Sequence, residues 1–422
     1  MNPLPRDRPV FSYYGDDFTG STDALEALAA NGLPAVLFLR VPGADDLRQF
    51  AGCRAVGVAG DARSRSPEWM RCALPPVFEL LRDLGAPLVQ YKVCSTFDSA
   101  PETGSIGCAL EIGQEVFEVA SVPVVAAAPL LGRYVAFGNL FAAGQGEVHR
   151  IDRHPSMASH PVTPMDESDL LLHLARQTSR RLALVDILAL RANGFEWPVA
   201  DAVLFDGIEP ADVAAAARRI WENRGTGRTF VVGSSGFTYG MLDYWRSEGC
   251  LPPAPRLAPP APANRLLVLA GSCSPTTASQ TGHALRNGFH GIRLNPCDRN
   301  HAAAEAEAIA QLAAGRSVVL YSALEPSDRV EIEDRHGAAA AMGRLLRRVI
   351  LRSKVTRVAI AGGDTASRAV QELGISALTF AAPIAHGAPL CRAHGWPHQL
   401  ELVLKGGQVG AGDFFEKALA WA

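Results

Sequence analysis

The stretch VFSYYGDDFTGSTDALEALAANGLPAVLFL, residues 10–39, contains the structural unit from which the fold is predicted. An apolar run (10–14) precedes an amphipathic stretch that ends at Asn31-Gly32, and a second apolar run follows (34–39). Short apolar runs that alternate with amphipathic segments indicate strand–helix–strand units. The opening of the chain therefore predicts an α/β fold.

The same alternation continues along the chain. Largely apolar runs are typical of parallel strands covered by helices on both faces, and they occur at 122–128, 181–187, 202–208 and 229–236. The pattern restarts with RLLVLAGS at 265–272. We expect two α/β domains with largely parallel sheets that face each other across a cleft.

The clearest boundary is LPPAPRLAPPAPA, residues 251–263, whose prolines disfavour helix and central strand. We predict a first domain at 1–250, a linker at 251–263 and a second domain at 264–422.

Composition narrows the classes of function. The 422 residues carry a formal net charge of only −3, which provides no broad cationic field for a nucleic acid. Eight cysteines occur without any CxxC pair, as expected for reduced thiols in a cytoplasmic protein. No run approaches 18 apolar residues, so we expect neither membrane insertion nor export.

The first candidate motif is the acidic pair Asp16-Asp17, which follows the first predicted strand. Ligands bind at the carboxyl ends of strands in open α/β sheets, and such a pair can orient or deprotonate a hydroxyl. The alternative is that one aspartate caps the following helix. For Asp23, a place in the first turn that complements the helix dipole is an equal alternative.

The second motif, GDARSRSP, places Arg63 and Arg65 on a loop after another apolar strand. A guanidinium there can bind a carboxylate through two parallel hydrogen bonds. Because arginine is abundant in this chain, a solvated loop charge is an equal alternative for each residue.

The third motif, QYKVCSTFDSAPETGSIG, starts two residues before Lys92. Lys92 leaves a predicted strand, Ser95 and Thr96 supply hydroxyls, and the backbone at Gly104 and Gly107 can present N–H groups at a helix start. The motif favours an anionic ligand. The alternative is a lysine at the strand edge that points to water.

Three glycine-containing segments in the second half are built like phosphate-binding loops: GSCSPTT (271–277), AGGDTAS (361–367) and LKGGQVGAGDFF (404–415). Glycines allow close approach of the backbone, and a helix start offers free N–H groups to an anion. Each segment alone could be a tight turn.

Several motifs are absent. The sequence has no GxxxxGK[ST] and no complete GxGxxG, which excludes a Walker loop and weakens a dinucleotide site. His386, His394 and His398 lie near Pro389 and Gly395, which favour a loop rather than a metal-binding helix.

Taken together, DDFTGSTD, GSCSPTTASQ, GGDTAS and LKGGQVGAGDFFEKAL resemble the four-carbon acid sugar kinase family across nearly the whole chain. The resemblance implies a sugar-acid-binding first domain, a nucleotide-binding second domain, and phosphorylation of threonate-, erythronate- or oxo-tetronate-type acids with ATP and Mg²⁺. It implies substrate contacts at Asp16, Asp17, Arg63, Lys92, Ser95 and Thr96, with one aspartate as the base. It implies nucleotide contacts at Ser272, Ser274, Gly362, Gly363, Asp364, Thr365 and Gly407. The magnesium ligands and the oligomeric state stay open, a homodimer being one option.

One departure bears on the substrate. Typical members read Lys-x-Asp-Ser-Thr-Leu-Arg-Gly where this chain has Cys94 in place of the aspartate and Asp98-Ser99 in place of Arg-Gly. This variant resembles a subgroup that acts on the branched acid 3-oxo-isoapionate. Two other classes are retained as alternatives: a nicotinamide-dependent oxidoreductase of a small hydroxy acid, and a non-catalytic protein that binds nucleotide or sugar acid.

Overall fold

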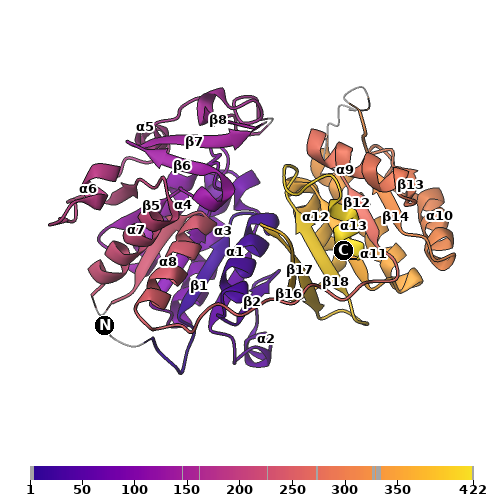
Figure 1. Cartoon of the computed structure of the whole chain (residues 1–422), viewed down its shortest axis with the longest axis horizontal. Coiled ribbons are helices and arrows are strands. Elements are labelled where there is room, and N and C mark those ends of the chain that lie inside the picture. Colours follow the sequence, from indigo (N-terminus) through magenta and orange to yellow (C-terminus); the bar gives the residue numbers. More distant parts are fainter. Residues whose placement is uncertain are drawn as a thin grey trace. The chain divides into compact units, whose positions relative to one another are not determined.

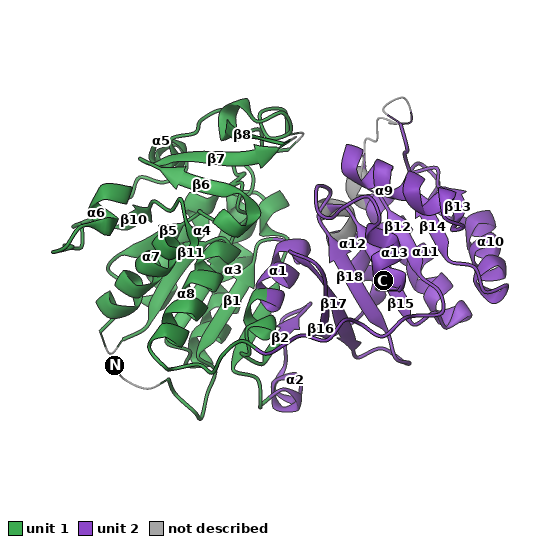
Figure 2. Ribbon diagram, in the orientation of Figure 1, with its two compact units in different colours: residues 1–16, 27–35, 51–254 green, residues 17–26, 36–50, 255–422 purple. Residues whose placement is uncertain are grey.

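The structure is a computed structural model that describes residues 4–144, 146–160, 162–225, 227–271, 274–325, 328 and 334–420, with only the backbone described at 335–336 and 363–366. It divides into two compact units (Figure 2). Unit 1 comprises Met1–Asp16, Ala27–Ala35 and Ala51–Ala254. Unit 2 comprises Asp17–Glu26, Val36–Phe50 and Pro255–Ala422. The first helix, α1 (Phe18–Ala30), contributes to both units.

Unit 1 contains a sheet in which every pairing among seven neighbouring strands is parallel (Figure 1). In sheet order these strands are β3 (Ala55–Ala59), β1 (Phe11–Gly15), β4 (Leu88–Lys92), β11 (Thr229–Gly233), β5 (Val122–Val125), β10 (Ala202–Phe205) and β9 (Leu182–Val185). The parallel α/β architecture predicted from the apolar runs is confirmed.

Helices connect these strands. They are α3 (Pro67–Asp83), α4 (Ile106–Phe117), α5 (Leu170–Ala175), α6 (Ile187–Arg191), α7 (Pro210–Asn223) and α8 (Ser235–Ser247). Connections through α3 and α4 run in one direction across the sheet and the connection through α7 runs in the other, so right-handed crossovers place them on opposite faces. A separate antiparallel sheet contains β6 (Arg133–Ala136), β7 (Asn139–Gly144) and β8 (Glu147–Arg150).

Two tyrosines of β1 pack against glycines in and directly after the neighbouring strand β3. A Cβ atom at Gly57 would lie 2.2 Å from the ring of Tyr13, and one at Gly60 would lie 1.8 Å from the hydroxyl of Tyr14. Both rings are buried, and Tyr14 stacks on Tyr91 of β4. The glycines therefore make room for the aromatic core beneath the end of β1.

Two predicted strands are shorter than expected, for the same reason. β9 ends at Val185 because the Asp186 carboxylate accepts hydrogen bonds from Leu188 and Ala189 and starts α6. β10 ends at Phe205, and the next side chain, Asp206, accepts backbone hydrogen bonds from other segments. Aspartate at these positions satisfies backbone donors that a continued strand would leave unpaired.

Unit 2 has a mixed sheet. Its order is β13 (His290–Arg293), β14 (Val318–Tyr321), β12 (Leu267–Ala270), β15 (Arg357–Ala361), β18 (Glu401–Lys405), β17 (Ala388–His394), β16 (Ala377–Ala385) and β2 (Ala35–Phe38). The first five strands pair in parallel and the last three join in antiparallel fashion. The loop predicted around Pro389 is wrong, since this residue lies in strand β17. Its pairing partner β16 has register shifts there, and a shifted ladder tolerates proline.

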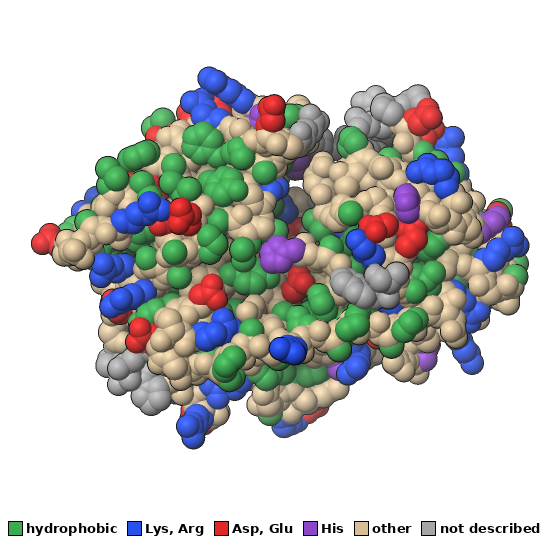
Figure 3. Space-filling view, in the orientation of Figure 1, with side chains coloured by type: hydrophobic (Ala, Val, Ile, Leu, Met, Phe, Trp, Pro, Cys, Tyr) green, Lys and Arg blue, Asp and Glu red, His purple; other side chains and the backbone are tan. Residues whose placement is uncertain are grey.

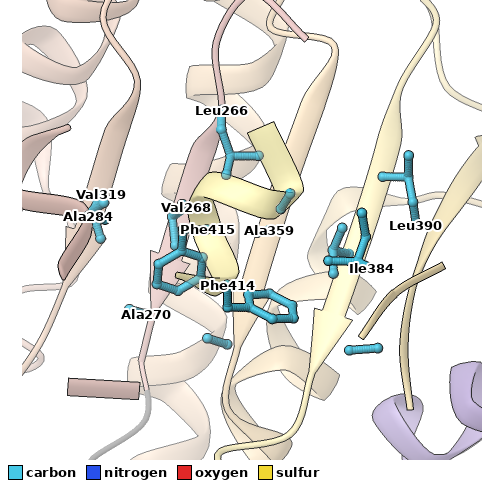
Figure 4. Close-up of a cluster of buried hydrophobic side chains, with 14 of the residues drawn as sticks. Leu266, Val268, Ala270, Ala284, Val319, Ala359, Ile384, Leu390, Phe414 and Phe415 are labelled. Carbon is cyan, nitrogen blue, oxygen red and sulfur yellow. The ribbon is translucent and has the colours of Figure 1, made fainter. Parts of the chain in front are cut away.

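The helices of unit 2 are α2 (Ala44–Gln49), α9 (Pro275–Arg286), α10 (Ala302–Ala313), α11 (Arg335–Ser353), α12 (Gly363–Leu373) and α13 (Phe414–Leu419). Phe414 and Phe415 of α13 pack into a core with Leu266, Val268 and Ile384 (Figure 4). This apolar core fixes the C-terminal glycine segment against strands β12 and β18.

The face drawn in space-filling form carries side chains of both charges. On the face shown in Figure 3, basic and acidic groups are interspersed. In the described part of the chain, no helix combines the length and apolarity that crossing a membrane requires.

Candidate functional site

The strand ends of unit 1 bring the three N-terminal motifs together. Gly15 of β1 lies in register with Ala59 on one side and Lys92 on the other. The Asp16 amide donates to the Lys92 carbonyl at 3.0 Å, and the Gly60 amide donates to the Gly15 carbonyl at 2.9 Å. Segments more than forty residues apart therefore meet at the carboxyl edge of one sheet, where such folds bind ligands.

Asp16 and Arg63 form a buried ion pair at this edge. Arg63 donates through Nη2 to Asp16 Oδ1 at 2.6 Å and through Nε to Oδ2 at 3.2 Å. The Arg63 amide also donates to the Asp16 carbonyl, which fixes the short helix Ala62–Ser64 beside β1. Asp16 is 3% exposed, so the pair orients a carboxylate within a largely water-free environment.

The neighbouring pair follows the same pattern. Arg65 donates through Nη2 and Nε to Asp61 Oδ2, at 2.6 and 3.2 Å, and its guanidinium lies over the Trp69 ring. Arg63 thus binds both oxygens of one carboxylate and Arg65 binds one oxygen of another, while contact of either arginine with a ligand remains a prediction. The bound carboxylates belong to the chain itself, so neither arginine is a solvated loop charge.

Asp17 caps α1. Its carboxylate accepts hydrogen bonds from the Gly20 amide at 2.8 Å and from the Thr19 hydroxyl at 2.6 Å. The capping alternative is therefore realised for the second aspartate of the pair, while its contact with a substrate remains a prediction. The first-turn alternative for Asp23 is not realised: α1 begins at Phe18, so Asp23 lies beyond the first turn.

Lys92 is buried, not directed to water. It is 2% exposed and its Nζ donates to the Val93 carbonyl at 3.0 Å. Ser95 and Thr96 are also buried, at 9% and 7% exposure. The water-facing alternative for the lysine is wrong, because β4 is an inner strand between β1 and β11 and the Lys92 side chain is buried.

Asp98 lies beside the predicted acid-binding residues, although it was not among them. Its Oδ1 accepts from the Thr96 hydroxyl at 2.6 Å, and that hydroxyl also lies 2.9 Å from Cys94 Sγ. Burial alone would raise the pKa of Asp98, but Arg63, the Thr96 hydroxyl and His160 together lower it. The carboxylate is thus kept ionised next to Cys94.

The segment after Asp98 is held by α5. The Ser99 hydroxyl lies 2.8 Å from His173 Nε2, and Gln177 Nε2 donates to Ser99 at 2.9 Å. Burial lowers the pKa of His173 to about 4, so the imidazole is neutral at physiological pH.

The expectation that Gly104 and Gly107 present free amides is wrong: they donate to the Arg65 carbonyl and the Gln177 side chain.

In unit 2 the three glycine segments also converge. Ala270, Ala361 and Lys405 lie in register at the ends of β12, β15 and β18. The Gly362 amide donates to the Lys405 carbonyl at 3.0 Å, and the Gly271 amide donates to Ala361. Three predicted phosphate loops thus begin at one edge of one sheet.

Ser274 joins two of these loops. It caps α9 by accepting from the Thr277 amide at 3.1 Å, and its hydroxyl donates to the Gly407 carbonyl. Gln280, one turn further along α9, donates to the carbonyls of Val409 and Ala411. The start of α9 and the C-terminal glycine loop therefore form one hydrogen-bonded unit.

Lys405 lies beneath this unit. It is fully buried, and its Nζ donates to the Thr277 hydroxyl at 3.0 Å and to the Gly406 carbonyl at 2.9 Å. Burial lowers the pKa of Lys405 to about 7. Among the described residues no carboxylate pairs with it. Lysine is rare in this arginine-rich sequence, and that rarity was a signal by which Lys405 could have been added to the predicted site.

Gly362 has φ 124° and ψ 132°, a conformation that only glycine adopts readily, immediately before α12. Of the other predicted nucleotide contacts, Ser272 and the side chains of Gly363, Asp364 and Thr365 lie outside the described residues. Across the residues that the structure covers, no group of three His, Cys, Asp or Glu could hold a metal ion.

Comparison with family models divides the chain in two. A model described as a sugar-binding N-terminal domain matches residues 11–241, and one described as a nucleotide-binding C-terminal domain matches residues 267–415. The two converged edges described above therefore lie in separate matched regions.

Two curated relatives match nearly the full length. The chain is 45% identical to a 3-oxo-isoapionate kinase of Paraburkholderia graminis, covering 96% of this chain and 93% of the relative. It is 29% identical to a 3-oxo-tetronate kinase of Pseudomonas savastanoi pv. phaseolicola, covering 98% and 97%.

Solved structures share the fold. A Salmonella typhimurium protein described as a putative tRNA synthase matches with a TM-score of 0.75 at 25% identity, covering 97% of this chain and 98% of its own. A Haemophilus influenzae protein of the DUF1537 family matches with a TM-score of 0.69 at 24% identity, covering 96% and 98%. With both family models and a full-length relative in agreement, the chain belongs to the four-carbon acid sugar kinase family.

Proposed function

We propose that the protein is an ATP-dependent kinase that phosphorylates a hydroxyl of 3-oxo-isoapionate, or of a closely similar sugar acid. The observation that carries this proposal is the 45% identity, over nearly the whole chain, to a kinase named for that substrate. The 3-oxo-tetronate kinases are 28–30% identical, so a four-carbon 3-oxo acid is the second candidate.

The edge of unit 2 suits a nucleotide triphosphate. Three features favour phosphate oxygens: the glycine-specific backbone conformation at Gly362, the helix start capped by Ser274, and the Lys405 ammonium, which pairs with no carboxylate of the described residues. We propose that these residues, with Gly407 and the segment Gly363–Thr365, hold ATP. When bound, ATP supplies the phosphoryl group that is transferred.

The edge of unit 1 suits a polyhydroxylated acid. We propose that Asp16, aligned by Arg63, accepts a hydrogen bond from the hydroxyl to be phosphorylated and removes its proton. Asp17 is the alternative base, although its carboxylate already caps α1. Lys92, Ser95 and Thr96 complete the proposed acid-binding group.

We propose that residues 1–250 bind the acid, residues 264–422 bind the nucleotide and residues 251–263 link the two domains. Because two substrates are assigned to two domains, transfer also requires a conformation that brings the reacting atoms into line. Magnesium is assigned to the ATP phosphates, since this ion commonly coordinates substrate phosphates and keeps several waters.

The oxidoreductase and non-catalytic alternatives have no relative among the matches described above.

The decisive experiment is a screen that measures ADP release with ATP and Mg²⁺. It covers 3-oxo-isoapionate, 3-oxo-tetronate, threonate and erythronate, with controls that lack acid.

Turnover with 3-oxo-isoapionate at a kcat/KM at least tenfold above that of the other acids would establish the proposal. A preference for 3-oxo-tetronate would move the assignment to the second candidate. If ATP binds in calorimetry but no acid is phosphorylated, the kinase proposal fails in favour of a binding protein.

A further inference from the structure

Arg133 is a partly buried arginine whose charge is not neutralised by any carboxylate in the part of the chain that the structure describes. It begins strand β6 of the small antiparallel sheet in unit 1. Its Nη1 donates to the Leu131 carbonyl, and its Nε is buried without a hydrogen-bond partner. Among the described residues it forms no ion pair, whereas Arg63 and Arg65 each bind an aspartate.

The backbone places Arg133 at the ligand-binding edge of the large sheet. Val125, at the end of β5, lies in register with Gly233, which in turn lies in register with Lys92. The chain then continues past this row to Ala128, which exchanges two backbone hydrogen bonds with Arg133, at 2.9 and 3.1 Å. Arg133 is therefore anchored on the carboxyl side of the strands, the same side as Asp16.

Electrostatics link Arg133 to the proposed acid-binding segment. Burial lowers the pKa of Arg133, while the thiol of Cys94 and the phenol of Tyr134 act in the opposite direction. Burial also lowers the pKa of His154, and the positive charge of Arg133 adds to that effect. Burial raises the pKa of the Cys94 thiol, so this thiol and the His154 imidazole are both neutral at physiological pH and neither balances the charge of the guanidinium.

A buried cation without an anion is costly to maintain, because desolvation is not offset by a partner. A guanidinium presents five N–H donors in a planar fork that matches a carboxylate. The acid proposed as the substrate carries one carboxylate, and Arg63 is already occupied by Asp16. The substrate carboxylate therefore needs a cation other than Arg63.

We propose that Arg133 binds the carboxylate of the sugar acid and thereby makes the enzyme specific for acids over neutral polyols. This inference rests on the proposed function but is testable without turnover. It adds a residue from the β6–β8 sheet to the substrate contacts expected from the sequence motifs.

The first test compares Arg133→Gln with the wild type in the kinase assay. We expect KM for the acid to rise about 30- to 300-fold, with kcat and KM for ATP within about threefold of wild type, as expected when a desolvated charge pair is lost. Arg150→Gln is the matched control, since Arg150 lies on the same small sheet but pairs with Asp152. An unchanged KM in Arg133→Gln would overturn the inference.

The second test separates binding from folding. Arg133→Ala should regain part of its kcat/KM, at least tenfold, when guanidinium or methylguanidine is added, which a purely structural role does not predict. Arg133→Lys should recover only part of the affinity, because an ammonium cannot form the bidentate pair. Absence of rescue, together with a lysine variant as active as wild type, would overturn the bidentate contact.

The third test uses calorimetry with erythronate and uncharged erythritol and requires no turnover. The wild type should bind erythronate at least tenfold more tightly than erythritol, and Arg133→Gln should lose this preference. The same preference in both proteins, or none in the wild type, would overturn the inference. Failure of the kinase screen with a preserved acid preference would overturn the proposed reaction alone.

Discussion

The charged side chains at the carboxyl edges of the two sheets have different kinds of partner. In unit 1, Arg63 and Arg65 each meet an aspartate of the chain. In unit 2, the buried Lys405 donates to a hydroxyl and a carbonyl oxygen and lies near the Phe414 ring, and it pairs with no carboxylate of the described residues. The first edge therefore offers carboxylates that can accept from hydroxyl groups, whereas the second keeps a cation available for an anion. This difference matches a division between an acceptor alcohol and a phosphate donor.

The largest effect is expected from removing the carboxylate charge in unit 1. Asp16→Asn should lower kcat about 10²- to 10⁴-fold, because it removes the proposed base and leaves Arg63 without its anion. Steady-state kinetics with the best acid of the screen measure the loss. Asp61→Asn breaks the neighbouring pair and should cost less than tenfold; equal losses in the two variants would argue against a special role for Asp16.

The corresponding change in unit 2 should affect the nucleotide instead. Lys405→Met should weaken ATP binding about 10- to 100-fold, which is the range for one charge-assisted contact, and should leave the KM of the acid unchanged. Calorimetry with ATP and Mg²⁺ measures the change. Lys417→Met removes an exposed lysine of α13 that pairs with Asp413 and should bind ATP normally.

The same lysine predicts how stability depends on pH. Burial lowers the pKa of Lys405 to about 7 in the folded protein, against about 10.5 in the unfolded chain. Between these values the unfolded chain binds more protons, so the free energy of unfolding should rise with pH, by about 1 kcal/mol per pH unit. Urea denaturation without nucleotide should show this rise in the wild type and not in Lys405→Met. If the stability of the two proteins depends on pH in the same way, the pKa of Lys405 is not lowered in the folded protein.

The smallest effect concerns the loop that Ser274 holds. Ser274→Ala removes the cap of α9 and the hydrogen bond to Gly407, and it should lower the free energy of unfolding by about 1 kcal/mol. ATP binding should weaken only about fivefold. Thr276→Ala, which removes an exposed contact to Gln408, is the control and should have less effect on both quantities. If Ser274→Ala leaves thermal and urea stability unchanged, the cap does not stabilise the helix.

Sequence patterns predicted the α/β class and the edges where chemistry is concentrated, because apolar runs identify parallel strands and polar residues follow their ends. They did not predict what those polar residues bind. Arg63 was expected to bind a ligand carboxylate, but its partner, Asp16, lies 47 positions earlier in the chain. Asp98 and Arg133 were not among the predicted site residues because their surroundings depend on packing against distant segments.

The error at Pro389 has a similar origin. Proline and glycine predict a loop when only local propensity is considered, yet β17 forms because β16 and β18 flank it on both sides. The register shift in β16 accommodates the residue that lacks an amide donor. Tertiary pairing thus outweighed a local preference.

The pairing of tyrosines with glycines across β1 and β3 has a consequence for how this protein can diverge. The ring of Tyr14 occupies the volume that a side chain at position 60 would need. A larger residue can therefore replace Gly60 during evolution only if Tyr14 is also replaced by a smaller residue. The same holds for Tyr13 and position 57. Substitutions at these positions should therefore covary among homologues, and Gly60→Ala should be tolerated only beside a smaller residue 14. The strand that carries the acidic pair is thus under an evolutionary constraint that arises from its interior packing alone.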